Sequence, residues 1–129
     1  FIDATVTVDG SKAKLDFDKF SVELPPEKAK KVIDGGYANK KVVLGIRPED
    51  IYDKEEELEK YSGCVVESDV TGYELLGAEV LLYFTINGAN MCAKVNSDTP
   101  ARYGDHIKVA FDVNKIHVFD KETEQIITN

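Results

Sequence analysis

The sequence is poor in the residues that build metal sites, disulfide frameworks and membrane spans. Of its 129 residues only two are cysteine, two are histidine and none is tryptophan. Cys64 and Cys92 are too few for a disulfide framework and show no zinc-site spacing, so we interpret both as reduced core residues. No apolar run approaches the roughly 20 residues that span a bilayer, which argues against insertion into a membrane.

Positive charge is scarce as well. The chain has 16 basic and 24 acidic side chains, giving a net charge of -8. Nucleic acids and anionic lipid surfaces bind clustered positive charge, so we expect no nucleic-acid partner. The length fits one domain or two small subdomains. The only methionine is Met91 and the sequence opens with Phe1, so we expect a fragment of a longer protein.

Motifs that carry catalytic chemistry are missing. The sequence has no Gly-x-x-x-x-Gly-Lys-[Ser/Thr] phosphate loop, no Gly-x-Gly-x-x-Gly and no Gly-x-Ser-x-Gly elbow. Its one double glycine, Gly35-Gly36, follows a predicted helix, whereas phosphate-binding glycines precede one. His106 and His117 have no cysteine or histidine at metal-ligand spacing. We therefore predict a non-catalytic chain with no catalytic residue, no bound metal and no cofactor.

Short alternating apolar stretches are plentiful and predict β-strands. The strongest turn signals are Asp9-Gly10 and Asn87-Gly88, which are typical of two-residue hairpins. One short helix is predicted over residues 27–34, where Ala29, Val32 and Ile33 share a face. The acidic stretch 49–60 is predicted to be a solvated loop with one helical turn at 55–58. The expected strands cover residues 1–8, 13–17, 20–24, 42–46, 63–73, 79–86, 89–95, 106–111, 115–119 and 125–128. This pattern is typical of a closed or partly open antiparallel barrel.

Two features suggest binding surfaces. Five lysines form a local basic patch that is either a solvated helix face or a site for an oxyanion: Lys28, Lys30, Lys31, Lys40 and Lys41. In residues 115–119, Ile116 and Val118 alternate with His117 and Phe119. If the first pair fills the barrel, the second pair faces outward and becomes a candidate contact of a symmetric dimer. The alternative is that Phe119 covers one end of the barrel.

Four motifs occur in an order that resembles one known family. They are Val43–Ile51 (VLGIRPEDI), Glu74–Glu79 (ELLGAE), Ala101–Asp105 (ARYGD) and Lys115–Asp120 (KIHVFD), the last followed by Glu122-Thr123. Their order and spacing hold over nearly the whole chain. The sequence resembles the C-terminal regulatory domain of ATP-binding subunits from bacterial sugar importers of the maltose, glycerol-phosphate and multiple-sugar type.

This resemblance implies a mainly β fold: an OB-like antiparallel β-barrel of the TOBE type with one short helix. It would occupy residues 1–129 as a regulatory and dimerisation domain, with two intertwined subdomains of about 1–62 and 63–129. The parent would be a cytoplasmic sugar-transporting ATPase that docks on two membrane permease subunits. Its ATPase domain, which uses ATP and magnesium, is absent here. Two copies would pair as a homodimer, and a regulatory protein binds this domain in some relatives.

The resemblance also singles out residues with structural roles, which are Gly45, Arg47, Pro48, Glu49, Gly77, Glu79, Gly104 and Asp105. We interpret the three glycines as places of tight bends or close approach. We expect Arg47 to pair with a carboxylate, for which Glu49 and Glu79 are candidates. Competing hypotheses are a small-oxyanion-binding module of the molybdate type, a single-strand nucleic-acid binder, and a free-standing enzyme.

Overall fold

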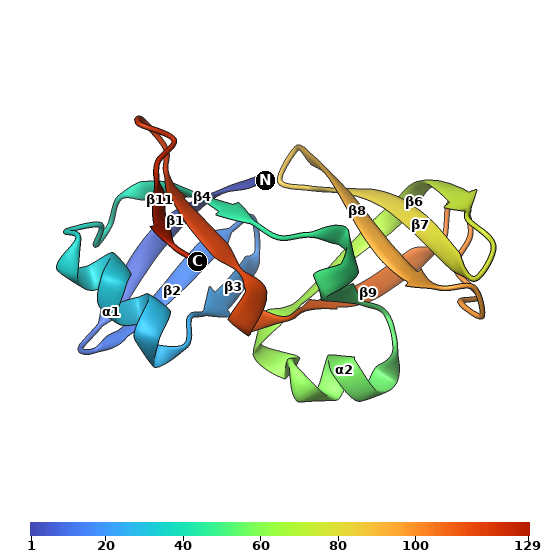
Figure 1. Ribbon diagram of the computed structural model, residues 1–129, viewed down its shortest axis with the longest axis horizontal. Helices are drawn as coiled ribbons and strands as arrows, with labels where there is room; N and C mark the ends of the chain where they lie inside the picture. The colour runs from blue at the N-terminus through green and yellow to red at the C-terminus, as the bar shows by residue number, and fades with distance from the viewer.

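The computed structural model describes residues 1–129 and shows two lobes side by side, each built on an antiparallel sheet (Figure 1). The six-stranded sheet of the first lobe has the order β11-β10-β4-β1-β2-β3. Its strands are β1 (Ile2–Asp9), β2 (Lys12–Phe17), β3 (Phe20–Glu23), β4 (Lys41–Gly45), β10 (His117–Asp120) and β11 (Ile126–Thr128). The chain therefore leaves this sheet after β4 and returns to it near its end.

The five-stranded sheet of the second lobe has the order β5-β9-β6-β7-β8. Its strands are β5 (Ile51–Tyr52), β6 (Val65–Leu75), β7 (Glu79–Ile86), β8 (Ala89–Asn96) and β9 (His106–Phe111). β5 also contacts β8, which brings the two outer strands together and nearly closes a barrel. The predicted mainly β, barrel-like antiparallel fold is confirmed. The expected division into subdomains of about 1–62 and 63–129 stays a prediction. The last two strands, β10 and β11, belong to the sheet of the first lobe.

Hairpins follow the turn signals of the sequence. Asn87 and Gly88 have φ of 51° and 79°, the left-handed pair that a two-residue turn between β7 and β8 requires. The first hairpin is shifted by one residue from the prediction. Asp9 still pairs with Lys12, so Gly10 and Ser11 form the turn, with Gly10 at φ 64°.

Helices are more numerous than the sequence pattern predicted. The expected helix is α1 (Pro26–Asp34), which buries Ala29 and Val32 and ends before Gly36 at φ 79°. The helical turn predicted at 55–58 is present and extends to six residues as α2 (Glu55–Lys60), so the structure has one short helix more than the single one expected. Three glutamates in the first turn of α2 and a lysine in its last turn stabilise it, because their charges interact favourably with the helix dipole. Short 3-10 turns cover Pro48–Asp50 (η1), Ser62–Cys64 (η2) and Val113–Lys115 (η3).

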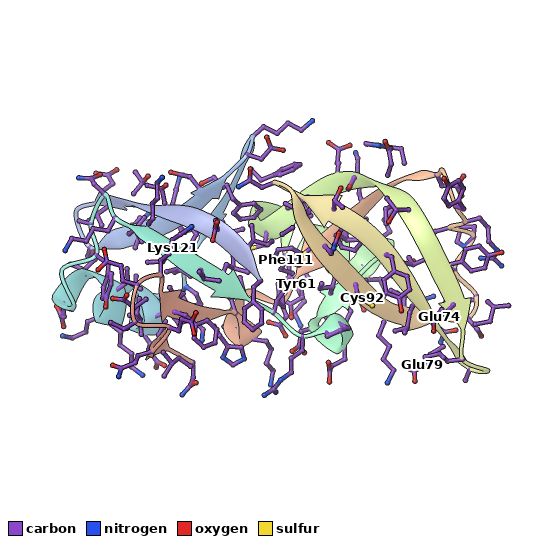
Figure 2. The ribbon with its side chains drawn as sticks, turned by 90° about the horizontal axis from the view of Figure 1, so that it is seen from above. Tyr61, Glu74, Glu79, Cys92, Phe111 and Lys121 are labelled. Atoms are coloured by element: carbon purple, nitrogen blue, oxygen red, sulfur yellow. The ribbon has the colours of Figure 1, made fainter.

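One hydrophobic core runs through both lobes. It joins inward-facing residues of the first sheet, such as Leu44 and Val118, to those of the second, such as Leu82 and Phe84. Phe111 is fully buried where the lobes meet (Figure 2). The two lobes are therefore held together by shared packing. None of the helices has the length and apolar content needed to cross a bilayer.

Candidate functional site

Strand β10 presents the two residues proposed as partner contacts. Ile116 and Val118 are fully buried in the core, as the alternation predicted. His117 and Phe119 are half-buried on the opposite face of the strand. β10 lies between β4 and β11, so both of its backbone edges are paired within the chain. A partner could therefore contact β10 only through the side chains on this face.

Phe119 is packed against its own chain. Its ring meets Phe1 edge to face, with centroids 5.6 Å apart and planes at 72°. It also lies over Gly45, where an added Cβ would sit 2.9 Å from Cε2 of Phe119 and 3.1 Å from Cε1 of Phe1. Gly45 therefore permits the close approach expected of it. Because Gly45 has no side chain, the Phe119 ring packs directly on the backbone at this position, and we call this contact the seat of the ring.

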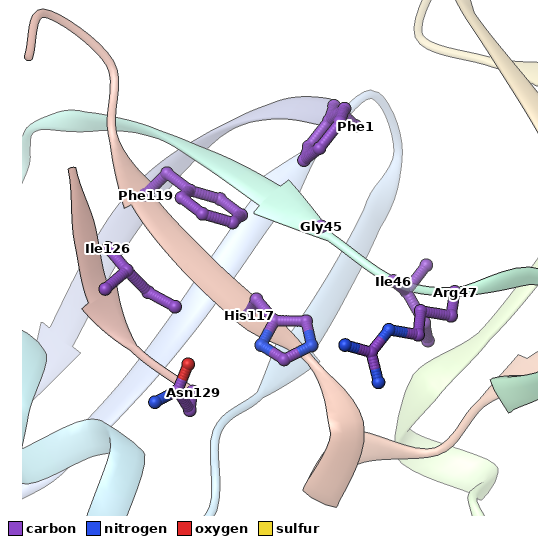
Figure 3. A pocket seen from close by; sticks show the side chains of 8 residues that line it. All are labelled: Phe1, Gly45, Ile46, Arg47, His117, Phe119, Ile126 and Asn129. Atoms are coloured by element: carbon purple, nitrogen blue, oxygen red, sulfur yellow. The ribbon is translucent and has the colours of Figure 1, made fainter. Parts of the chain in front are cut away.

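A pocket of about 340 Å³ opens beside this ring (Figure 3). Its wall consists of Phe1, Gly45, Ile46, Arg47, His117, Phe119, Ile126 and Asn129. Burial, with the positive charge of Arg47, lowers the pKa of His117 below its ordinary value, so the imidazole is neutral at pH 7. Its Nδ1 atom is buried and has no hydrogen-bond partner within the chain. The pocket is thus half apolar, with one cation and one neutral ring at its rim.

Arg47 makes no ion pair, and the expectation that it pairs with Glu49 or Glu79 is wrong. Glu79 lies at the outer end of the second lobe (Figure 2) and its Oε1 is 3.5 Å from Nζ of Lys94. Glu49 lies in the η1 turn, which Pro48 opens, and its side chain is exposed. The family-motif residues therefore do not gather at one site, because they are spread over both lobes.

Two motif glycines lie in turns that need a left-handed backbone. Gly77 has φ 78° between β6 and β7, and Gly104 has φ 85° ahead of β9. The Gly104 turn is fastened to the sheet, since its N–H donates to the carbonyl of Val70 at 2.9 Å. The Asp105 carboxylate accepts the N–H of Arg102 at 2.8 Å and closes the turn. The role of these residues in this structure is to shape loops.

The five lysines do not form one patch. Lys28 is buried to 7% exposure, and burial lowers its pKa. Lys30 pairs with Asp34 at 2.7 Å on the surface of α1. Lys40 and Lys41 line a separate open hollow of about 740 Å³ together with Gly35, Tyr37, Asp120, Lys121 and Glu122. That hollow on the first lobe brings three lysines, Lys40, Lys41 and Lys121, together with two acidic residues, Asp120 and Glu122.

No group of three histidine, cysteine or acidic side chains is close enough to hold a metal ion. Both cysteines are free thiols, and burial raises the pKa of Cys64 to about 11. The sequence analysis missed one surface, the exposed apolar end of β6 with Tyr73 and Leu75, which Leu76 extends into the following turn. The signal was available, because only one of residues 70–76 is charged.

Two linked antiparallel lobes with shape-determining glycines define an OB-like β-barrel domain. The MalK OB fold domain matches residues 1–51 and the TOBE domain matches residues 44–119. The chain belongs to the TOBE domain family, as its motifs indicated. The two matches together cover residues 1–119, and neither is a match to an ATPase domain.

Curated relatives agree with this assignment. The oligosaccharides import ATP-binding protein MsmX of Bacillus subtilis is 38% identical over 81% of this chain and 28% of its own length. The trehalose/maltose import ATP-binding protein MalK of Thermococcus litoralis is 35% identical over 98% of this chain and 34% of its own. The multiple sugar-binding transport ATP-binding protein MsmK of Streptococcus mutans is 33% identical over 85% and 29%. The chain thus spans about a third of the length of these relatives.

A solved structure shares the fold. The cytoplasmic molybdate-binding protein ModG, crystallised with molybdate bound, superposes with a TM-score of 0.66 over 91% of this chain and 92% of its own. The two sequences are 13% identical, so the likeness concerns architecture alone.

Proposed function

We propose that this chain is the C-terminal regulatory and pairing domain of the ATP-binding subunit of a carbohydrate importer. The observation that carries the proposal is the similarity to three sugar import ATP-binding proteins over 81 to 98% of the chain. In this role the domain binds no nucleotide. ATP and magnesium would be bound by the ATPase domain of the parent protein.

The work of the domain is mechanical. Two copies associate and keep two ATPase subunits together while their nucleotide sites open and close. The parent is cytoplasmic and reaches the membrane through permease subunits, and a regulatory protein binding to the barrel would switch uptake off. The single core that joins both lobes supports this role, because a rigid body transmits force between attached parts. His117 and Phe119 remain candidate contacts in this pairing.

A hybrid protein tests the proposal. The segment of MsmX that matches this chain is replaced by residues 1–129, and the hybrid is expressed in Bacillus subtilis cells that lack MsmX. We expect growth on an imported oligosaccharide to be restored. A matched hybrid carrying Val118→Asp, which buries a charge in the core, should fail. If the hybrid is produced in folded form and hydrolyses ATP but supports no uptake, the proposed function is wrong.

A second candidate function is oxyanion binding, favoured by the hollow that Lys40, Lys41 and Lys121 share. Two features oppose it: Lys121 already pairs with Asp3 at 2.8 Å, and Asp120 and Glu122 also line the hollow. Calorimetric titration with molybdate, tungstate and sulfate decides the matter. Heat that disappears in a Lys40→Ala, Lys41→Ala variant would support this second function, and absence of heat would dismiss it.

A further inference from the structure

The pocket beside β10 exists because one strand of the first sheet lacks a side chain at this place. His117 is the register partner of Gly45, so its ring stands next to a residue that has only backbone. The rings of Phe119 and Phe1 also contact Gly45, where an added Cβ would sit 2.9 Å from the first and 3.1 Å from the second. The pocket of about 340 Å³ therefore has a backbone floor and aromatic walls (Figure 3).

Two nitrogen-bearing side chains lie at the mouth of this pocket. The guanidinium of Arg47 makes no ion pair within the chain, and Figure 3 shows it and the His117 imidazole turned toward one another. Nδ1 of His117 is buried without a partner, so Nε2 is the nitrogen that reaches the pocket. A buried N–H without an acceptor is rarer in proteins than a buried lone pair, so we expect the proton of the neutral ring on Nε2. Both side chains then offer N–H donors to the pocket.

The charges around His117 leave an excess of positive charge. Burial lowers the pKa of His117, Arg47 and Lys28 lower it further, and Asp50 acts in the opposite direction. The neutral ring therefore has two cations and one carboxylate as its charged neighbours. Lys28 is buried and, like Arg47, makes no ion pair. The positive charge at this pocket is thus incompletely neutralised, in a chain whose net charge is -8.

The rest of the wall is mostly apolar. Ile46 and Ile126 join Phe1 and Phe119 in lining it. Phe1 is 75% exposed and Ile126 is 48% exposed, so a molecule seated here would remove apolar surface from water. Sites for small molecules typically combine an apolar wall with a few polar groups that fix the orientation of the ligand.

We propose that this pocket binds a small organic carboxylate. The carboxylate accepts hydrogen bonds from the guanidinium of Arg47 and from Nε2 of His117, and the apolar body of the ligand packs against Phe119 and Ile126. A planar guanidinium can bind a carboxylate through two parallel hydrogen bonds, which are stronger than bonds between neutral groups. An inorganic oxyanion would leave the apolar wall exposed, and an uncharged ligand would leave the guanidinium unpaired. The site does not depend on the function proposed above.

Other hollows suit an anion with an apolar body less well. The hollow that contains Lys40 and Lys41 also contains Asp120 and Glu122, and only one hydrophobic residue lines it. A hollow of about 250 Å³ beside α2 has three carboxylates in its wall. Like charges repel, so both hollows disfavour a carboxylate.

A titration of the 129-residue chain with benzoate at pH 7, followed by nuclear magnetic resonance, tests the proposal. Benzamide has the same shape without the charge, and acetate has the charge without the ring. We expect benzoate to bind with a millimolar dissociation constant, and each of the other two roughly tenfold more weakly. The ring nitrogens of His117 should shift on binding and should report a proton on Nε2. The chain has two histidines, so His106→Gln identifies the signals of His117.

Three variants locate the bound benzoate. Arg47→Gln removes the charged donor and should weaken binding roughly tenfold or more, whereas His117→Phe removes a neutral donor and should weaken it about fivefold. His117→Phe also removes a buried nitrogen that has no partner, and Arg47 is exposed, so both variants should fold. Lys41→Gln is the matched control, because it removes one positive charge from the other hollow. It should bind benzoate as the wild type does.

Four results would overturn the proposal. They are no binding of benzoate at tens of millimolar, equal affinity for benzamide, unchanged affinity in a folded Arg47→Gln, and loss of binding in Lys41→Gln. The last result would place the anion in the lysine hollow. None of them bears on the proposed role in an importer, which the hybrid protein tests separately.

Discussion

The seat of Phe119 on Gly45 predicts a strong coupling between these two residues. In Gly45→Ala the new Cβ would lie 2.9 Å from Cε2 of Phe119, whereas carbon atoms prefer about 3.5–4.0 Å. The ring must therefore swing outward, which it can do because it is half-buried. An off-rotamer side chain costs about 0.5–1.5 kcal/mol, and a weakened contact with Phe1 costs a similar amount.

A compensating gain reduces this loss. Alanine restricts the unfolded chain more than glycine does, which favours folding by about 0.5–1 kcal/mol. We therefore expect Gly45→Ala alone to lower the free energy of unfolding by about 1 kcal/mol. In a Phe119→Ala background the ring is gone and only the exposed Phe1 remains nearby. The same substitution should then be neutral or stabilising, giving a coupling energy of about 1–2 kcal/mol.

Urea unfolding of the wild type, both single variants and the double variant measures this coupling. The slopes of the four transitions should agree, so that differences in midpoint report stability. If Gly45→Ala destabilises the chain equally with and without the Phe119 ring, the glycine does not act as the seat of that ring.

Three further predictions follow from burial and hydrogen bonding. Ile116→Ala should lower the free energy of unfolding by roughly 2–5 kcal/mol, because Ile116 is fully buried, and a urea midpoint close to that of the wild type would contradict its core position. With a pKa of about 11, against an ordinary value of 9.0, Cys64 should have roughly a hundredfold less thiolate at pH 8 than an exposed cysteine, so Ellman's reagent should label it at a matching slow rate until the chain unfolds. Hydrogen bonds from His106 to the Asp69 carboxylate, and secondly to Glu67, raise the pKa of His106 above 6.5; the stability they add is complete below pH 6.5 and is lost as the pH rises through the higher folded-state pKa. Urea midpoints between pH 6 and pH 8.5 should therefore fall more for the wild type than for His106→Gln, and parallel profiles would show that these bonds contribute nothing.

Local features of the fold could be predicted from sequence. Alternation placed Ile116 and Val118 inside, and Asn87-Gly88 located a hairpin, because each signal depends on residues close along the chain. The pairing of Val118 with Leu44 could not be predicted, since it joins distant segments and no local pattern specifies it. The sequence predicted only one helical turn at 55–58 where α2 runs from Glu55 to Lys60, because acidic residues are equally typical of a solvated loop.

The candidate sites show the same contrast between local patterns, which the sequence reveals, and contacts between distant segments, which it does not. An ion pair between Arg47 and Glu79 was expected from the sequence motifs. The structure places Glu79 in the second lobe, where its carboxylate lies near Lys94. The seat of Phe119 on Gly45 depends on two strands that meet only in the folded sheet. Sequence identified the residues that matter to the fold, and only the tertiary arrangement showed which of them touch.

The return of the chain to its first sheet imposes an order on folding during synthesis. β1 to β4 leave the ribosome early, but β10 pairs with β4 only after more than half of the chain has followed. Until then one flank of β4 has no neighbour, while the second lobe can already close, since all its strands precede β10. We therefore expect the second lobe to fold first, and β10 and β11 to complete the sheet of the first lobe last. In the interval one edge of β4 is unpaired and accessible to chaperones.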